Sequence, residues 1–300
     1  MSRLSRMDVS AMEMRVSSLI EALRSSGGHV EIDLAGRLWR CQQQRHERRR
    51  GLRDRVDRPC RSVACEYCRR WRAREWRERA AEQMSSAENA HSSMVTIMLE
   101  RAGELSAVRD IIRDFRVALR NLRDRRARAD GRWRKFAAVG LAELDFLEPG
   151  DLPLLPSMRR AVISALPVRS HGDQGEVVVH VHLAVSHPMI PRHAVERAFM
   201  QQWDGAGRVD VGEFYADVDG PENAAGIIAY AAKHRMVTTF HAGVEMPVPM
   251  SWQARYWGWL HGLGCGLAPL RVRMTPMRDP VLRRFHAKES EPMPILLGVW

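Results

Sequence analysis

The stretch Glu176-Val-Val-Val-His-Val-His-Leu-Ala-Val185 decides the fold. Every second residue from 177 to 185 is valine or leucine, which is the period of two that a half-buried β-strand shows. One face of this strand therefore packs on a core, and the opposite face carries His180 and His182. Two imidazoles one pleat apart on the same face can bind one divalent ion. The alternative is a pair of histidines on a solvated side of the sheet.

Short β-like runs and helical segments alternate on both sides of this strand. Further strands are predicted over 94–99, 136–146, 209–218 and 270–274, and helices over 6–25, 69–88, 103–128, 157–166, 191–203, 221–234 and 250–262. Residues 37–68 are predicted to be irregular, and 149–156 to be a loop with prolines. This order predicts an α+β fold, with an antiparallel central sheet flanked by helices. A first domain is expected over 1–90 and a second over 91–300.

The charge of the chain is strongly uneven. The 300 residues contain 47 Lys and Arg against 36 Asp and Glu, a formal net charge of +11. Between Arg37 and Arg79 there are 16 Arg against six acids, so this segment supplies almost the whole excess. A local positive field of this kind favours a polyanion, and nucleic acid is the first candidate. No apolar run is long enough for a membrane span, and no signal-peptide pattern is present, so a cytoplasmic location and no membrane partner are expected.

Three of the five cysteines form a short cluster, Cys60-x4-Cys65-x2-Cys68. Clustered thiolates with this spacing suit a tetrahedral structural Zn²⁺ better than disulfides. The fourth ligand is predicted to be Cys41, with His46 as the alternative. The competing interpretation is three buried cysteines that are close by coincidence.

Arginines surround this cluster, and they are positioned to reach the phosphates of a nucleic acid. The predicted DNA-contacting residues are Arg58, Arg61, Arg69 and Arg70.

A third ligand for the histidine pair must come from a neighbouring strand. Glu143 is the best candidate, and Asp145 is the alternate on the same strand face. One carboxylate and two imidazoles leave coordination positions open for water or a phosphate oxygen, which suits Mg²⁺ or Mn²⁺.

The helix predicted over 221–234 contains Tyr230 and Lys233, which lie three residues apart and share a face. A tyrosine oxygen can attack a phosphodiester when a metal polarises the phosphate and a nearby positive charge favours the phenolate. The alternative is that Tyr230 is a surface tyrosine without a catalytic role and that Lys233 is a solvated lysine beside it.

The order of these motifs resembles the HUH endonucleases, most closely the rolling-circle replication initiators (Rep proteins) of small bacterial plasmids. The resemblance runs from about Cys41 to Lys233. It implies an HUH-type sheet with an N-terminal zinc-binding module, His180, His182 and Glu143 as ligands of the catalytic metal, and Tyr230 as a single nicking tyrosine with Lys233 beside it. Gly226 occupies the position where some relatives carry a glutamate that acts as a base in termination.

The resemblance also implies an activity and partners. The protein is expected to nick single-stranded origin DNA, to leave a 5′-phosphotyrosine and a free 3′-OH, and to rejoin strands. The origin DNA, as a hairpin or single strand, and a host helicase, single-strand binding protein and polymerase are the implied partners.

Two other functions remain open at this point. One is an HUH transposase of an insertion sequence, and the other is a non-enzymatic zinc-dependent DNA-binding protein. The Trp-rich segment near the C-terminus, with Trp252, Tyr256 and Trp257, is predicted to pack in the core rather than to stack on unpaired bases.

Overall fold

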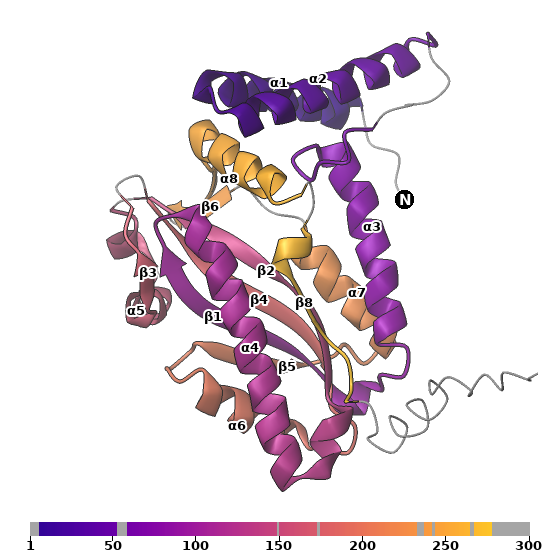
Figure 1. The fold of residues 1–300 in the computed structure, drawn as a ribbon, viewed down its shortest axis with the longest axis vertical. Helices are drawn as coiled ribbons and strands as arrows, with labels where there is room; N and C mark the ends of the chain where they lie inside the picture. Colours follow the sequence, from indigo (N-terminus) through magenta and orange to yellow (C-terminus); the bar gives the residue numbers. More distant parts are fainter. Residues whose placement is uncertain are drawn as a thin grey trace, which may run out of the picture.

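The computed structural model describes residues 6–52, 59–148, 150–172, 175–232, 237–241, 244–264 and 267–277. These residues form an α+β fold in which helices cover both faces of a curled, mixed β-sheet (Figure 1). The helices are α1 (Arg6–Ser26), α2 (His29–Arg49), α3 (Glu66–Gln83), α4 (Leu105–Ala129), α5 (Ser157–Ala165), α6 (Arg192–Gln202), α7 (Gly220–Ala231) and α8 (Met250–Gly262). The strands are β1 (Ser92–Ala102), β2 (Ala137–Leu147), β3 (Val168–Ser170), β4 (Glu176–Ser186), β5 (Val209–Glu213), β6 (Val237–His241), β7 (Val244–Pro247) and β8 (Arg271–Met274).

The strand that carries the two histidines, β4, lies in the middle of the sheet. The strand order is β3-β1-β4-β2-β8, and β5 pairs with the same edge of β1 as β3. β4 is antiparallel to both β1 and β2, and β8 is antiparallel to β2. The predicted antiparallel core of the sheet is therefore confirmed. The exception is β3, which pairs with β1 in parallel and was not predicted, because only three residues form it.

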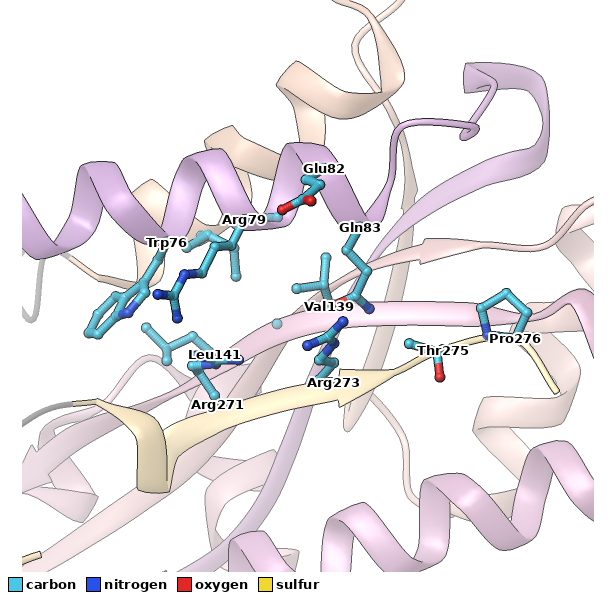
Figure 2. Close-up of a pocket in the computed structure, with 13 residues that line it drawn as sticks. Trp76, Arg79, Glu82, Gln83, Val139, Leu141, Arg271, Arg273, Thr275 and Pro276 are labelled. Carbon is cyan, nitrogen blue, oxygen red and sulfur yellow. The ribbon is translucent and has the colours of Figure 1, made fainter. Parts of the chain in front are cut away.

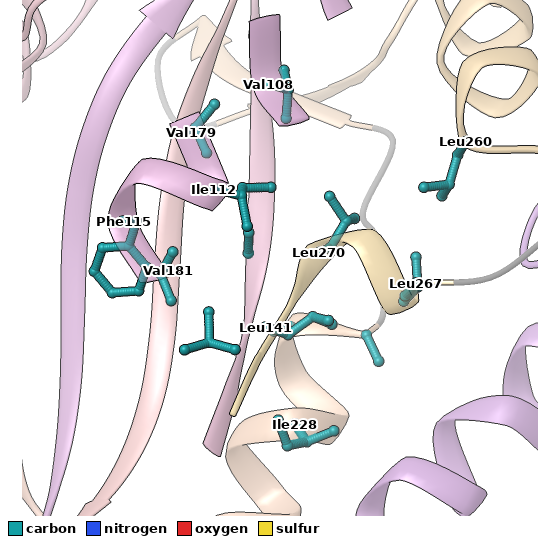
Figure 3. Close-up of a cluster of buried hydrophobic side chains, with 14 of the residues drawn as sticks. Val108, Ile112, Phe115, Leu141, Val179, Val181, Ile228, Leu260, Leu267 and Leu270 are labelled. Atoms are coloured by element: carbon teal, nitrogen blue, oxygen red, sulfur yellow. The ribbon is translucent and has the colours of Figure 1, made fainter. Parts of the chain in front are cut away.

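The apolar face of β4 packs against α4. Val179 and Val181 lie in one buried cluster with Val108, Ile112 and Phe115 of that helix (Figure 3). The helix presents these residues because their spacing places them on one stripe of an α-helix. This packing fixes which way β4 faces, since a shift of one residue would exchange its two faces.

The histidine face of β4 is covered by two smaller apolar clusters, one at each end. Ala184 packs with residues of α7 at one end, and Val178 packs with residues of α5 at the other. His180 and His182 lie between these two clusters. The sheet therefore leaves a polar gap between α5 and α7, and the candidate site lies in that gap.

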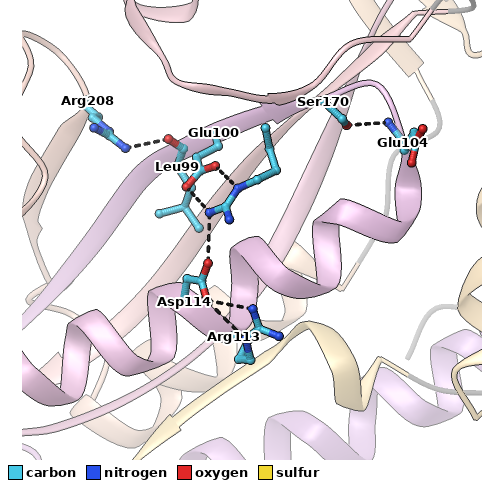
Figure 4. Close-up of polar contacts among 8 residues, drawn as sticks. Leu99, Glu100, Glu104, Arg113, Asp114, Ser170 and Arg208 are labelled. Atoms are coloured by element: carbon cyan, nitrogen blue, oxygen red, sulfur yellow. Dashed lines mark hydrogen bonds and ion pairs between the residues drawn. The ribbon is translucent and has the colours of Figure 1, made fainter.

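The end of β1 next to this gap is held by charged side chains (Figure 4). The register of β1 shifts between Met98 and Glu100, which is a β-bulge. Arg208 donates hydrogen bonds to the carbonyls of Met98 and Leu99, at 2.9 and 2.7 Å. Glu100 forms a bidentate pair with Arg169, at 2.8 and 2.9 Å. The two hydrogen bonds from Arg208 satisfy carbonyls at the bulge, and the Glu100–Arg169 pair joins β1 to β3.

The prediction of irregular structure over 37–68 is wrong for its first part, because α2 runs to Arg49. The helix buries Leu34, Leu38 and Cys41 against α1 and α8, and a hydrogen bond of 2.9 Å joins His261 of α8 to Asp33. The many arginines on the exposed face of α2 hide this stripe in the sequence.

One hydrophobic cluster extends from Val16 of α1 to Met274 of β8. The two segments predicted as domains, 1–90 and 91–300, therefore share a core.

The aromatic residues of α8 are part of this core, as predicted. Trp252, Tyr256 and Trp257 are buried, and the rings of Trp252 and Phe146 lie 4.2 Å apart. Burial raises the pKa of Tyr256 far above its usual value.

The strand predicted over 209–218 ends at Glu213, so Tyr215 lies after β5 instead of within it. Within the described ranges, no helix combines the length and the apolar composition needed to cross a membrane.

Candidate metal centre and tyrosine site

Glu143, His180 and His182 meet on the histidine face of the sheet. Glu143 of β2 lies directly across from His180 of β4 in the antiparallel register. One oxygen of Glu143, Oε2, lies 3.2 Å from Nε2 of His180 and 3.2 Å from Nε2 of His182. All three side chains are nearly buried. The structure thus brings together the three residues that the sequence singled out as ligands.

The electrostatics of this group favour a carboxylate at neutral pH. Burial raises the pKa of Glu143, but the contacts with His180 and His182 outweigh it and hold the pKa at about 2. Burial lowers the pKa of His180, and the nearby Asp145 and Glu143 carboxylates more than compensate, so the net shift is upward. An anionic oxygen and two imidazoles therefore face each other in a site that attracts a cation.

The donor atoms fit a divalent ion. Octahedral Mg²⁺ with ligands at about 2.1 Å places neighbouring donors about 3 Å apart, close to the separation of Glu143 Oε2 from each imidazole. Nε2 of His182 is buried and makes no hydrogen bond of good geometry to any described residue. His187, on the chain just beyond β4, shows the contrast, because its two ring nitrogens bond Ser93 Oγ and the carbonyl of Ile190. Nε2 of His182 is therefore available to bind a metal, whereas both ring nitrogens of His187 already form hydrogen bonds.

Two further residues lie beside the imidazoles, and Thr96 is within hydrogen-bond distance of one of them. Thr96 of β1 lies across from His182, and its Oγ1 is 3.0 Å from Nδ1 of His182. Asp145 Oδ2 is 3.7 Å from Nδ1 of His180 and is also paired with Arg159 at 2.9 Å. Asp145 therefore lies behind His180, and Glu143 lies between the two rings. Sequence reasoning missed Thr96, whose only signal was its place in the predicted strand over 94–99.

Thr96→Val is expected to weaken Mn²⁺ binding about 10- to 100-fold, which is the usual cost of losing a partner that orients a metal-binding histidine. A threonine hydroxyl that accepts from Nδ1–H of His182 leaves Nε2 unprotonated and able to bind the ion. Isothermal titration with Mn²⁺ measures the change, and Thr96→Ser, which keeps the hydroxyl, should restore binding. Equal affinities of the valine variant and the parent protein would show that Thr96 only fills space.

Tyr230 reaches the candidate metal centre from the last turn of α7. Its ring lies edge-on to His182, with ring centroids 5.4 Å apart, and half of its surface is exposed. Lys233 lies outside the described residues. Gly226 and Glu222 lie on the same side of α7, one and two turns before Tyr230.

A cavity of about 600 Å³ opens beside this tyrosine. His182, Thr96, Tyr230 and Tyr215 line it, together with Arg77 of α3. Tyr215 is 69% exposed, and its backbone is held by hydrogen bonds to Asn223. The cavity therefore exposes two tyrosines, of which Tyr230 is the one in ring contact with a candidate metal ligand. Arg77 is exposed and was not predicted, because α3 is charged on nearly every side.

The four cysteines Cys41, Cys60, Cys65 and Cys68 form a second, buried group. The Sγ of Cys68 lies 3.9 Å from that of Cys41 and 3.4 Å from that of Cys60. Zn–S bonds of about 2.3 Å in a tetrahedron place the sulfurs about 3.8 Å apart, so the group fits one Zn²⁺. His46 is exposed on α2 and is not part of the group. The structure therefore favours Cys41 over His46 as the fourth ligand.

Within the cysteine group the thiolate is favoured at Cys41, while contacts with Cys41 raise the pKa of Cys60 and Cys65. Hydrogen bonds from Cys60, Cys65 and Cys68 lower the pKa of Cys41. Burial lowers the pKa of Arg45, but its bond to Cys41 outweighs burial and raises it. Cys65 precedes the first turn of α3, where the helix dipole also favours negative charge.

The predicted DNA-contacting arginines differ in their exposure. Arg58 lies outside the described residues. Arg61 is exposed, and Arg70 is exposed and paired with Glu66 at 3.0 Å. Arg69 packs over the ring of Trp257 at 5.4 Å, and burial lowers its pKa. Of the three that are described, Arg61 and Arg70 are the ones that face solvent.

Comparison of the chain with protein-family models, with curated proteins and with solved structures finds no match.

Proposed function

We propose that this protein is an HUH-type endonuclease that nicks single-stranded DNA through Tyr230, and that the nick starts rolling-circle replication. The observation that carries the proposal is the contact of Tyr230 with His182, next to the group of Glu143 and two histidines. A tyrosine exposed to a cavity beside three metal-ligating side chains is the arrangement that phosphodiester attack requires. The resemblance of the motifs to plasmid initiators supports the biological role.

Each side chain has a defined task in this mechanism. Glu143, His180 and His182 would hold Mg²⁺ or Mn²⁺, which when bound supplies stabilisation of the negative charge on the phosphate. Tyr230 Oη forms a bond to phosphorus as the bond from phosphorus to the 3′-oxygen breaks. The phenol loses its proton, and the 3′-oxygen gains one and leaves as a hydroxyl. Because the phosphotyrosine keeps a phosphodiester bond, the reverse attack by a 3′-OH rejoins the strand.

The charge distribution supports a nucleic acid as substrate. The basic segment between Arg37 and Arg79 includes most of α3, and Arg77 of this helix lines the cavity beside Tyr230. A structural Zn²⁺ at the cysteine group would fix the start of the same helix. The basic module and the nicking site are thus physically connected.

The test uses random-sequence single-stranded oligonucleotides with Mn²⁺, because it does not require the origin to be known. Oligonucleotides labelled at the 3′ end should become covalently attached to the protein and remain attached in a denaturing gel. Oligonucleotides labelled at the 5′ end should instead yield a free shortened fragment with a 3′-OH. Sequencing of the attached strands gives the preferred site.

Each result has a distinct meaning. Attached sequences that match a replication origin support the replication role, and sequences that match the ends of a mobile element support the transposase. Attachment of the 5′-labelled fragment would contradict the proposed polarity. DNA binding without cleavage in Mg²⁺ or Mn²⁺ would contradict the nuclease and leave a zinc-dependent DNA-binding protein.

Arg77→Ala is expected to lower the rate of adduct formation at subsaturating DNA about 10-fold, since a guanidinium in the cavity can bind the phosphate beside Tyr230. The rate is measured as a function of oligonucleotide concentration. Arg74→Ala is the matched control, because Arg74 is on the same helix but pairs with Glu78 at the surface. An equal loss in both variants would indicate a general effect of charge on α3.

A further inference from the structure

A second cavity, of about 490 Å³, lies between α3 and the edge of the sheet formed by β2 and β8 (Figure 2). Arginines line it from two elements, with Arg79 on α3 and Arg271 and Arg273 on β8. Trp76 lies at one end, and Val139 and Leu141 contribute apolar surface from the sheet. The cavity is separate from the one beside Tyr230, and the mechanism described above does not use it.

The alternation of β8 directs both arginines to the face of the sheet that carries the metal centre. Arg271 lies across from Leu141, and Leu141 lies across from His182 on the next strand. Paired residues of antiparallel strands point to the same face, so these three residues form one row. Neighbouring strands are about 4.8 Å apart, which places the backbones of Arg271 and His182 roughly 10 Å apart. The arginine cavity therefore flanks the metal centre.

The positive charges in this cavity are poorly neutralised. Among the described residues, no ion pair involves Arg271 or Arg273, whereas Arg79 is paired with Glu75 on its own helix. Glu82 is the one carboxylate that lines the cavity.

The Arg271 side chain is destabilised by its burial and by the neighbouring arginines. Burial and the charges of Arg79 and Arg273 lower the pKa of Arg271, and Glu75 offsets this only in part. The carbonyl of Arg271 is held by Arg116 from the other face of the sheet, with a hydrogen bond of 2.9 Å. Like charges fixed close together in this way are stabilised when an anion lies between them.

We propose that this cavity binds the phosphodiester backbone of single-stranded DNA next to the segment that is cut. The inference rests on the proposed function for the identity of the DNA, and on the three arginines for the anion. The cavity is bounded by α3 and by the sheet and has a volume of about 490 Å³, so we assign it to one strand and not to a duplex. Its apolar surface at Val139 and Leu141 suits the sugar and base of a nucleotide better than it suits free phosphate.

The test compares Arg271→Ala/Arg273→Ala with Arg109→Ala/Arg120→Ala in the full chain. The second pair removes the same charge from exposed positions on α4, which covers the opposite face of the sheet. Binding of fluorescent oligo(dT) is followed by anisotropy between about 50 and 200 mM salt. The β8 variant should bind about 10-fold or more weakly, and its salt slope should fall by about 1.4, since each lost phosphate contact removes about 0.7. The α4 variant should bind as the parent protein does.

Three results of the DNA-binding assay would overturn the inference. They are equal binding by the β8 variant and the parent, an equal loss in both double variants, and a loss of duplex binding as large as that of oligo(dT). Titration with inorganic phosphate covers the remaining source of the anion. Phosphate binding that disappears in the β8 variant while oligo(dT) binding is unchanged would assign the cavity to a small anion and also overturn it.

Adduct formation tests the proposed function, and oligo(dT) binding tests this inference, so the two can fail separately. The α4 variant should form the adduct at the rate of the parent, and the β8 variant should form it more slowly at subsaturating DNA, because Arg271 and Arg273 bind the DNA. If the parent forms no adduct but its oligo(dT) binding depends on Arg271 and Arg273, the nuclease proposal fails and the binding site stands.

Discussion

Tyr230→Phe should abolish the covalent protein–DNA adduct, with a fall in rate of ~1,000-fold or more, because the variant lacks the attacking oxygen. The aromatic ring and its edge-on contact with His182 are retained, so metal binding and DNA affinity should stay within about twofold of the parent. Gel quantification of the adduct with 3′-labelled oligonucleotides measures the rate, and titration with Mn²⁺ verifies the metal centre. Loss of metal binding in the same variant would mean that the hydroxyl supports the site instead of performing the attack.

Tyr215→Phe is the matched control for this experiment. Tyr215 lines the same cavity and is even more exposed than Tyr230, but ring contact with His182 is described for Tyr230 and not for Tyr215. Its replacement should leave adduct formation unchanged. If Tyr215→Phe removed the adduct and Tyr230→Phe did not, the nucleophile would be the residue that follows β5, and the assignment to α7 would be wrong.

The group of Glu143, His180 and His182 could be predicted from the sequence because its geometry is local to two strands. The alternation of β4 fixes the shared face of His180 and His182, and the same rule places Glu143 and Asp145 on one face of β2. The choice between the two acids could not be made in this way, since it depends on the register between β2 and β4. The structure supplies that register and puts Glu143 opposite His180.

The residues that reach the candidate sites from distant segments could not be predicted from the sequence. Thr96 and Arg77 meet the site through strand pairing and helix packing, and neither has a distinctive pattern of neighbours. The arginine cavity requires residues almost 200 positions apart, at Arg79 and Arg273, to face each other. Helix α2 was missed for another reason, since its charged residues mask the buried stripe that contains Leu38 and Cys41.

Helix α3 connects the cysteine group to both cavities. It begins directly after Cys65 and includes Cys68 in its first turn. Further along, Arg77 lines the tyrosine cavity, and Arg79 lines the arginine cavity. The helix also packs against α7, which carries Tyr230. A metal that fixes the start of α3 would therefore determine where these arginines lie relative to the tyrosine.

Cys41→Ala should consequently remove bound zinc and destabilise the N-terminal helices. Three remaining thiolates hold Zn²⁺ less tightly than four, and structural zinc supplies on the order of 10 kcal/mol of folding free energy in small zinc modules. The zinc content per chain should fall from one to near zero, and the thermal transition should shift downward or broaden. His46→Ala should retain both the zinc and the transition, because His46 is outside the cysteine group. Zinc that survives in Cys41→Ala but is lost in His46→Ala would reverse the assignment of the fourth ligand. A parent protein purified without zinc, whose melting is insensitive to added zinc and to chelators, would show that the four thiols stabilise α3 through packing alone.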